Sequence, residues 1–66
     1  MVEKYSEKYQ QICRAILQRC NEKKKLGIKN LYDSDIYDIQ TILKNQHVKA
    51  SYQDVSDTLD MLLNQE

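Results

Sequence analysis

Residues that break helices are almost absent from this chain, and this limits what it can fold into. Among its 66 residues there is no proline and one glycine, Gly27, so long segments can stay helical without interruption. The chain is rich in Lys, Glu, Gln and Leu, which favour the α-helix. Charged residues make up 30% and apolar residues 41% of it, a balance typical of a folded globule rather than a disordered tail. We therefore expect an all-α domain.

Apolar residues recur every three or four positions in three segments, which predicts a three-helix bundle. The helices are expected at about residues 3–25, 34–46 and 52–64 of a single domain that spans residues 1–66. The predicted core residues are Tyr5, Tyr9, Ile12, Cys13, Ile16, Leu17 and Cys20 in the first helix, Ile36, Ile39, Leu43 and, at the margin, Ile42 in the second, and Tyr52, Val55, Leu59, Leu62 and Leu63 in the third.

Local signals mark the ends of these helices. A run of lysines at residues 23–25 suits the negatively charged carboxyl end of the first helix, and Gly27 supplies the permissive backbone on which a helix stops. The same lysines are also compatible with a phosphate-binding patch. Ser51 and Asp54 have the spacing of a capping box that opens the third helix. The second helix has three candidate caps, Asp33, Ser34 and Asp35.

The sequence contains no combination of residues that indicates a catalytic or metal site. Cys13 and Cys20 stand about 10.5 Å apart along the first helix, farther than the ~7 Å between Cα atoms that a disulfide can span, so we expect two free thiols on the apolar face. Metal binding would need further Cys or His ligands. The one histidine, His47, falls in a predicted turn without a neighbouring nucleophile. We therefore expect neither an enzyme nor a bound cofactor.

Length and hydropathy set the expected compartment and stability. No apolar run approaches the ~18 residues of a membrane span, and the first eight residues are polar, unlike a signal peptide. We therefore expect a cytoplasmic protein that does not enter a membrane. A chain of this size buries only ~60% of the surface that its unfolded form exposes, and a single core then contributes roughly 3–5 kcal/mol. A homodimer or a bound partner protein would supplement that stability.

Charge is divided unevenly along the chain, although its net value is zero. Residues 1–30 carry eight basic and three acidic side chains, whereas residues 31–66 carry two basic and seven acidic ones. Such polarity can steer encounters with a charged partner. In the third helix, Asp54, Asp57 and Asp60 are expected to lie together on the exposed side. Aspartates also suit the first turns of a helix and keep an exposed face hydrated, which is a purely structural explanation of them.

The last two predicted helices and the turn between them follow a recognisable pattern. A Leu-Lys pair ends the second helix, a serine caps the third, and a Val-Ser pair is followed by leucines at helical spacing. The positions concerned are Leu43, Lys44, Ser51, Val55, Ser56, Leu59 and Leu62. This stretch resembles the helix-turn-helix of winged-helix regulators of the arginine-repressor type.

The resemblance implies a tri-helical core with a helix-turn-helix-like arrangement of the second and third helices. It also implies that the first turn of the last helix enters the major groove of DNA. Two features depart from the family pattern. Asp57 stands where members usually carry Arg or Lys, and the chain ends at Glu66 without a wing.

Two hypotheses about function follow, and the first is a non-enzymatic protein-interaction module of the inhibitor, anti-repressor or adaptor type. The acidic side of the third helix, with tyrosine and methionine as anchors, would bind a partner protein that has a basic surface. Tyr37, about 100° from Ile36 around the second helix, is expected to be exposed. The residues assigned to this surface are Tyr37, Gln53, Asp54, Asp57, Asp60 and Met61.

The alternative is a minimal helix-turn-helix transcriptional regulator that binds DNA. Its phosphate contacts would come from Arg14, Arg19, Lys23, Lys24, Lys25 and Lys29, and its base contacts from Gln53 and Ser56. The three aspartates of the third helix argue against it, because each would repel a phosphate about 4 Å away by ~1 kcal/mol in a water-like dielectric. Lys44 and Lys49, which are nearby in the sequence, would offset this repulsion only in part.

Overall fold

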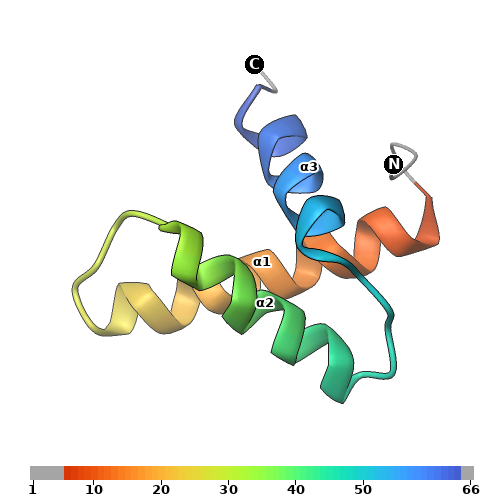
Figure 1. Ribbon diagram of the computed structural model, residues 1–66. Helices are drawn as coiled ribbons and strands as arrows, with labels where there is room; N and C mark the ends of the chain where they lie inside the picture. The colour runs from red at the N-terminus through yellow and green to blue at the C-terminus, as the bar shows by residue number, and fades with distance from the viewer. Residues whose placement is uncertain (1–5, 65–66) are drawn as a thin grey trace.

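The computed structural model describes residues 6–64, and over that range the chain forms three helices and no strand (Figure 1). The helices are α1 (Glu7–Lys25), α2 (Asp33–Asn45) and α3 (Tyr52–Leu63). Each helix packs against the other two. The predicted all-α, three-helix fold is therefore confirmed.

The three helices form a thin layered molecule in which α1 and α2 run side by side in opposite directions and α3 crosses them (Figure 1). The Cα extents are 32 × 31 × 17 Å. Two packed helices, with axes about 9 Å apart and a Cα radius of about 2.3 Å each, have a Cα extent of about 14 Å, so the shortest dimension holds two layers of helices and no more. Each helix therefore keeps one side in solvent. Among residues 6–64, no helix combines the length and the apolar character that crossing a bilayer requires.

The core lies where the three helices meet. Its buried apolar side chains are Tyr9, Ile12, Ala15 and Ile16 of α1, Ile36, Ile39 and Leu43 of α2, and Val55 of α3. Half-buried residues surround them, and those predicted for the core are Cys13, Cys20, Ile42, Tyr52, Leu59 and Leu62. The core of α1 and α2 thus follows the predicted apolar stripes closely.

Two leucines predicted to be buried are exposed instead. Leu17 is 61% exposed because it lies about 100° around α1 from Ile16, on the side that no other helix covers. Leu63 is 71% exposed because the last turn of α3 extends past the other two helices (Figure 1). The predicted core position of Tyr5 lies outside the described residues.

Both ends of α1 are set by local hydrogen bonds. The hydroxyl of Ser6 accepts a hydrogen bond from the backbone N–H of Tyr9 at 3.1 Å. This cap places the start of the helix at Glu7, later than the predicted start at residue 3. Residues 3–5 lie outside the described range. At the other end, Gly27 has φ 79°. The N–H of Ile28 donates to the carbonyl of Lys23 at 2.9 Å. This is a Schellman-type helix end, as the lysine run followed by glycine predicts.

The carboxyl end of α2 repeats that geometry without a glycine. His47 occupies the left-handed position with φ 61°. The N–H of Val48 donates to the carbonyl of Leu43 at 2.9 Å, and the N–H of His47 donates to that of Lys44 at 3.0 Å. His47 itself is exposed in the turn.

Both later helices begin with a carboxylate in the first turn that accepts the N–H of the capping residue. The predicted caps of α2 are wrong in position: the N-cap is Tyr32, and Asp35, the third residue of the helix, accepts the backbone N–H of Tyr32 at 2.7 Å. At the start of α3, the N–H of Asp54 donates to Ser51 Oγ at 3.0 Å, and the N–H of Ser51 donates to Asp54 Oδ2 at 3.2 Å. The predicted capping box is confirmed.

Candidate interaction surfaces

The outer side of α3 carries the acidic surface predicted from the sequence, in a reduced form. Gln53 and Asp60 are exposed and Asp57 is half-buried. Gln53 Nε2 donates to Asp57 Oδ1 at 2.7 Å. Within residues 6–64, neither Asp57 nor Asp60 forms an ion pair, and α3 contains no Lys or Arg. We call Gln53, Asp57 and Asp60, with the exposed Leu63 beside them, the α3 surface.

Asp54 was expected on that surface, and this expectation is wrong. Its side chain is 15% exposed, and its Oδ2 accepts a hydrogen bond from Lys8 Nζ at 2.8 Å. The Lys8 ammonium and the backbone N–H of Ser51 hold the pKa of Asp54 below its ordinary value. The carboxylate is therefore neutralised by α1 and used as a helix cap.

Met61 also departs from the prediction, for the same geometric reason. Seven residues after Asp54, it lies on nearly the same side of the helix. It is half-buried and packs against the core. Met61 is therefore not an outward-facing anchor.

Tyr37 is exposed as predicted, with 62% of its surface accessible. Its ring lies 5.2 Å from that of Tyr52, centroid to centroid, at 48° between the ring planes. Aromatic pairs at this separation attract each other. The pair places the exposed ring of α2 directly beside the first turn of α3.

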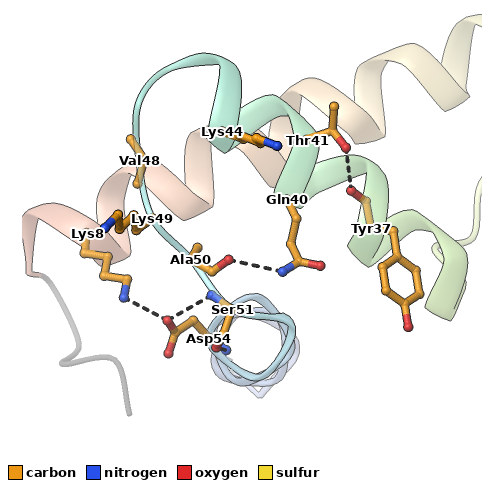
Figure 2. A pocket seen from close by; sticks show the side chains of 10 residues that line it. All are labelled: Lys8, Tyr37, Gln40, Thr41, Lys44, Val48, Lys49, Ala50, Ser51 and Asp54. Carbon is orange, nitrogen blue, oxygen red and sulfur yellow. Dashed lines mark hydrogen bonds and ion pairs between the residues drawn. The ribbon is translucent and has the colours of Figure 1, made fainter.

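A groove of about 740 Å³ lies where α2, the α2–α3 connection and the start of α3 meet (Figure 2). Lys8, Lys44 and Lys49 contribute basic side chains to its lining, and the half-buried Val48 and Ala50 contribute apolar ones. Sequence reasoning missed this groove because its lining comes from separate segments that only the packing brings together.

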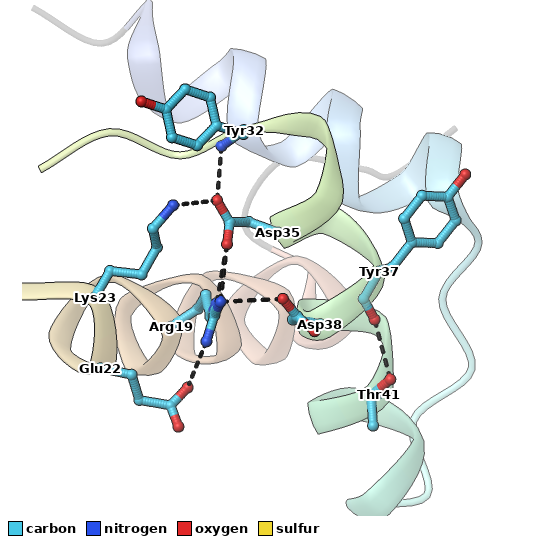
Figure 3. A network of polar contacts seen from close by, with 8 residues as sticks. All are labelled: Arg19, Glu22, Lys23, Tyr32, Asp35, Tyr37, Asp38 and Thr41. Atoms are coloured by element: carbon cyan, nitrogen blue, oxygen red, sulfur yellow. Dashed lines mark hydrogen bonds and ion pairs between the residues drawn. The ribbon is translucent and has the colours of Figure 1, made fainter. Parts of the chain in front are cut away.

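A buried ionic cluster joins α1 to α2 (Figure 3). Asp35 and Lys23 are 2% and 5% exposed, and Lys23 Nζ donates to Asp35 Oδ2. Arg19 Nε donates to Asp35 Oδ1 at 3.1 Å, and its Nη2 lies 3.1 Å from Asp38 Oδ2. The Lys23 ammonium also lies 4.6 Å from the centroid of the Tyr32 ring, a cation–π distance.

The cluster keeps the carboxyl group of Asp35 ionised. Burial by itself would raise the pKa of Asp35, but hydrogen bonds from Lys23, the Tyr32 N–H and Arg19 outweigh burial, and the pKa lies below its ordinary value. The sequence contains a signal for the burial of one member of this cluster, Lys23. Lys23 follows Ile16 by seven residues and so lies within about 20° of it on the buried face of α1.

The predicted nucleic-acid contacts are only partly available. Arg19 and Lys23 are held by Asp35, whereas the other basic residues proposed as phosphate contacts are exposed and form no ion pair with described residues: Arg14, Lys24, Lys25 and Lys29. The loop after α1 and the α2–α3 connection lie at opposite ends of the molecule (Figure 1). The structure therefore does not gather Lys24, Lys25 and Lys29 beside the predicted base-contacting residues Gln53 and Ser56 of α3.

The described part of the chain offers no metal-binding cluster. Within residues 6–64, no three His, Cys, Asp or Glu side chains are grouped so that they could hold an ion. Cys13 and Cys20 are free and half-buried against the core, as predicted. No protein-family model, curated protein or solved structure matches this chain.

Proposed function

We propose that this protein is a small, non-enzymatic interaction module of the inhibitor, anti-repressor or adaptor type, which binds a basic surface of a partner protein through the α3 surface. The observation that carries the proposal is the charge of this surface. Asp57 and Asp60 form no ion pair with described residues, on a helix that contains no basic residue. Two uncompensated carboxylates on one exposed helix favour a cationic partner.

Apolar and aromatic groups beside the carboxylates support the same proposal. Leu63 lies one turn after Asp60 and is 71% exposed. Tyr37 is 62% exposed and is held next to α3 by its contact with Tyr52. The carboxylates would then accelerate the encounter with a basic partner protein. The leucine and tyrosine side chains would supply the buried contact area that holds the complex together.

A DNA-binding regulator is the second candidate. It is supported by the resemblance to helix-turn-helix regulators and by Lys24, Lys25 and Lys29, which are exposed and form no ion pair with described residues. The neutralisation of Asp54 by Lys8 removes one of the three expected repulsions. However, the two remaining carboxylates belong to the helix that the resemblance would insert into the major groove. We therefore favour a protein as the partner.

The test is site-specific crosslinking in a lysate of the native host. A photo-crosslinking amino acid at Gln53 should capture a partner protein, whereas the same group at Gln18, exposed on α1, should not. Capture should fall about tenfold in the variant Asp57→Lys/Asp60→Lys, a change of about 1.4 kcal/mol.

The matched control is Glu7→Lys/Asp33→Lys, which changes the net charge by the same amount on α1 and α2. Equal capture by the α3 variant and this control would remove the α3 surface from consideration. Salt-sensitive binding of the unmodified chain to random duplex DNA, lost on reversal of Lys24, Lys25 and Lys29, would instead support the regulator.

A further inference from the structure

The groove beside the start of α3 is lined by no residue of the α3 surface, although it includes the neighbouring Tyr37, and it carries the opposite charge. We propose that it binds an acidic, partly apolar peptide segment of a partner protein, so that the molecule has a second docking site. The proposal does not depend on the role of the α3 surface.

The charges of the groove favour an anion. Lys44 and Lys49 line it and form no ion pair with any described residue. The only carboxylate in the described lining, Asp54, is already paired with Lys8 at 2.8 Å (Figure 2). Two ammonium groups therefore remain uncompensated at its edge, and they complement one or two carboxylates of a peptide.

The remaining lining favours an apolar side chain between those carboxylates. Gln40 Nε2 donates to the carbonyl of Ala50 at 3.1 Å, and Thr41 Oγ1 donates to the carbonyl of Tyr37 at 3.0 Å (Figure 2). One N–H of Gln40 and the hydroxyl proton of Thr41 already have partners, so an apolar group can cover these two hydrogen bonds without breaking them. The Tyr37 ring and Val48 provide apolar area for such a contact.

The size of the groove suits a short segment of chain. Its volume of about 740 Å³ falls within the ~300–1,000 Å³ that is common for binding pockets in proteins. A peptide can place its one or two carboxylates against the lysines. A nucleic-acid strand brings a phosphate at every nucleotide and would extend onto α3, where Asp57 and Asp60 repel it. A peptide is therefore the occupant that the charges favour.

The test begins with selection of random peptides on the immobilised full-length chain. Selected sequences should be enriched in Asp or Glu next to a large apolar residue. A fluorescently labelled selected peptide should then bind in solution, and Lys44→Glu/Lys49→Glu should weaken binding about tenfold, measured by fluorescence anisotropy. The control Lys24→Glu/Lys25→Glu, with the same charge change at the end of α1, should alter it less than about twofold.

Several outcomes would overturn the proposal. They are no enrichment of acidic peptides, equal binding by the Lys44/Lys49 and Lys24/Lys25 variants, and displacement of the peptide by a much tighter-binding oligothymidine. Circular dichroism confirms that each variant is folded, and Lys44→Gln/Lys49→Gln replaces the reversal if the latter unfolds. Asp57→Lys/Asp60→Lys should retain peptide binding, so failure here and failure of the proposed function are distinguishable.

Discussion

At the scale of single residues, Lys23 and Asp35 show that charged side chains can belong to the core. Both are almost fully buried, yet each has a partner of opposite charge and neither leaves a polar atom unsatisfied. Removal of charge from water is unfavourable, and the pair is tolerated because the ion pair and further hydrogen bonds replace the lost hydration. Breaking this buried pair should therefore cost more stability than breaking an exposed ion pair.

Asp35→Asn tests this argument. It leaves the Lys23 ammonium buried without a compensating charge, so we expect a loss of roughly 3 kcal/mol, or about 15 °C in melting temperature for a domain of this size. Thermal unfolding followed by circular dichroism measures it. Asp38→Asn removes an exposed carboxylate that also pairs with Arg19 and should cost less than about 1 kcal/mol. Similar losses in the two variants would contradict a special role for burial.

His47 offers a second residue-scale test, because it holds a left-handed backbone conformation that glycine adopts without strain. His47→Gly should stabilise the protein by about 0.5–1 kcal/mol, because the relief of backbone strain exceeds the added freedom of the unfolded chain.

Gly27→Ala, at the end of α1, should destabilise the protein. No atom of the described residues lies within 4 Å of the added Cβ, so the backbone at φ 79° is what opposes the substitution. Urea titration measures both, and a destabilised His47→Gly would refute the argument.

At the scale of elements, α3 depends on its capping box and on its contact with α1. The Ser51 hydroxyl accepts the N–H of Asp54, and the Asp54 carboxylate accepts both the N–H of Ser51 and the ammonium of Lys8. The aspartate therefore joins the local start of a helix to a side chain 46 residues away.

Removal of the cap should loosen α3 before the other helices. Ser51→Ala should cost about 1 kcal/mol and increase amide hydrogen exchange in the first turn of α3 relative to α2. Ser34→Ala, at an exposed serine in the first turn of α2, is the matched control and should change exchange little. Uniformly faster exchange in all three helices would show instead that α3 does not open separately.

At the scale of the whole molecule, stability should fall in acid. The folded-state pKa values of Asp35 and Asp54 both lie below the ordinary value of 3.8. Folding therefore favours their ionised forms, and the stability from this source is complete above about pH 5 and is lost as the pH falls through 3.8 and below. Thermal melts at a series of pH values should be level from about pH 7 to 5 and fall steeply below about pH 4.

One substitution separates this source from general acid unfolding. Asp54→Asn removes a group whose ionisation is linked to folding, so its melting temperature should depend less on pH below about pH 4. Asp60→Asn, at an exposed carboxylate that forms no ion pair within residues 6–64, should retain the pH dependence of the unmodified chain. If the melting temperature of Asp54→Asn fell in acid as steeply as that of the unmodified chain, this carboxylate would be excluded as a source of the pH dependence.

The sequence by itself determined the three helices and most of their ends. Helical spacing, the Ser51 capping box and Gly27 act within one or two turns of the chain, so no knowledge of packing was needed to interpret them. The same local geometry predicted the exposure of Tyr37, Gln53 and Asp60.

Only the tertiary structure decided which charges face solvent. Asp54 is neutralised by Lys8, and Asp35 holds Lys23 and Arg19, across separations in sequence that no periodic pattern encodes. The groove likewise exists only because α2 and α3 meet at the connection between them. The physical reason is that an ion pair depends on the distance between two atoms in space, and that distance is set when the helices pack.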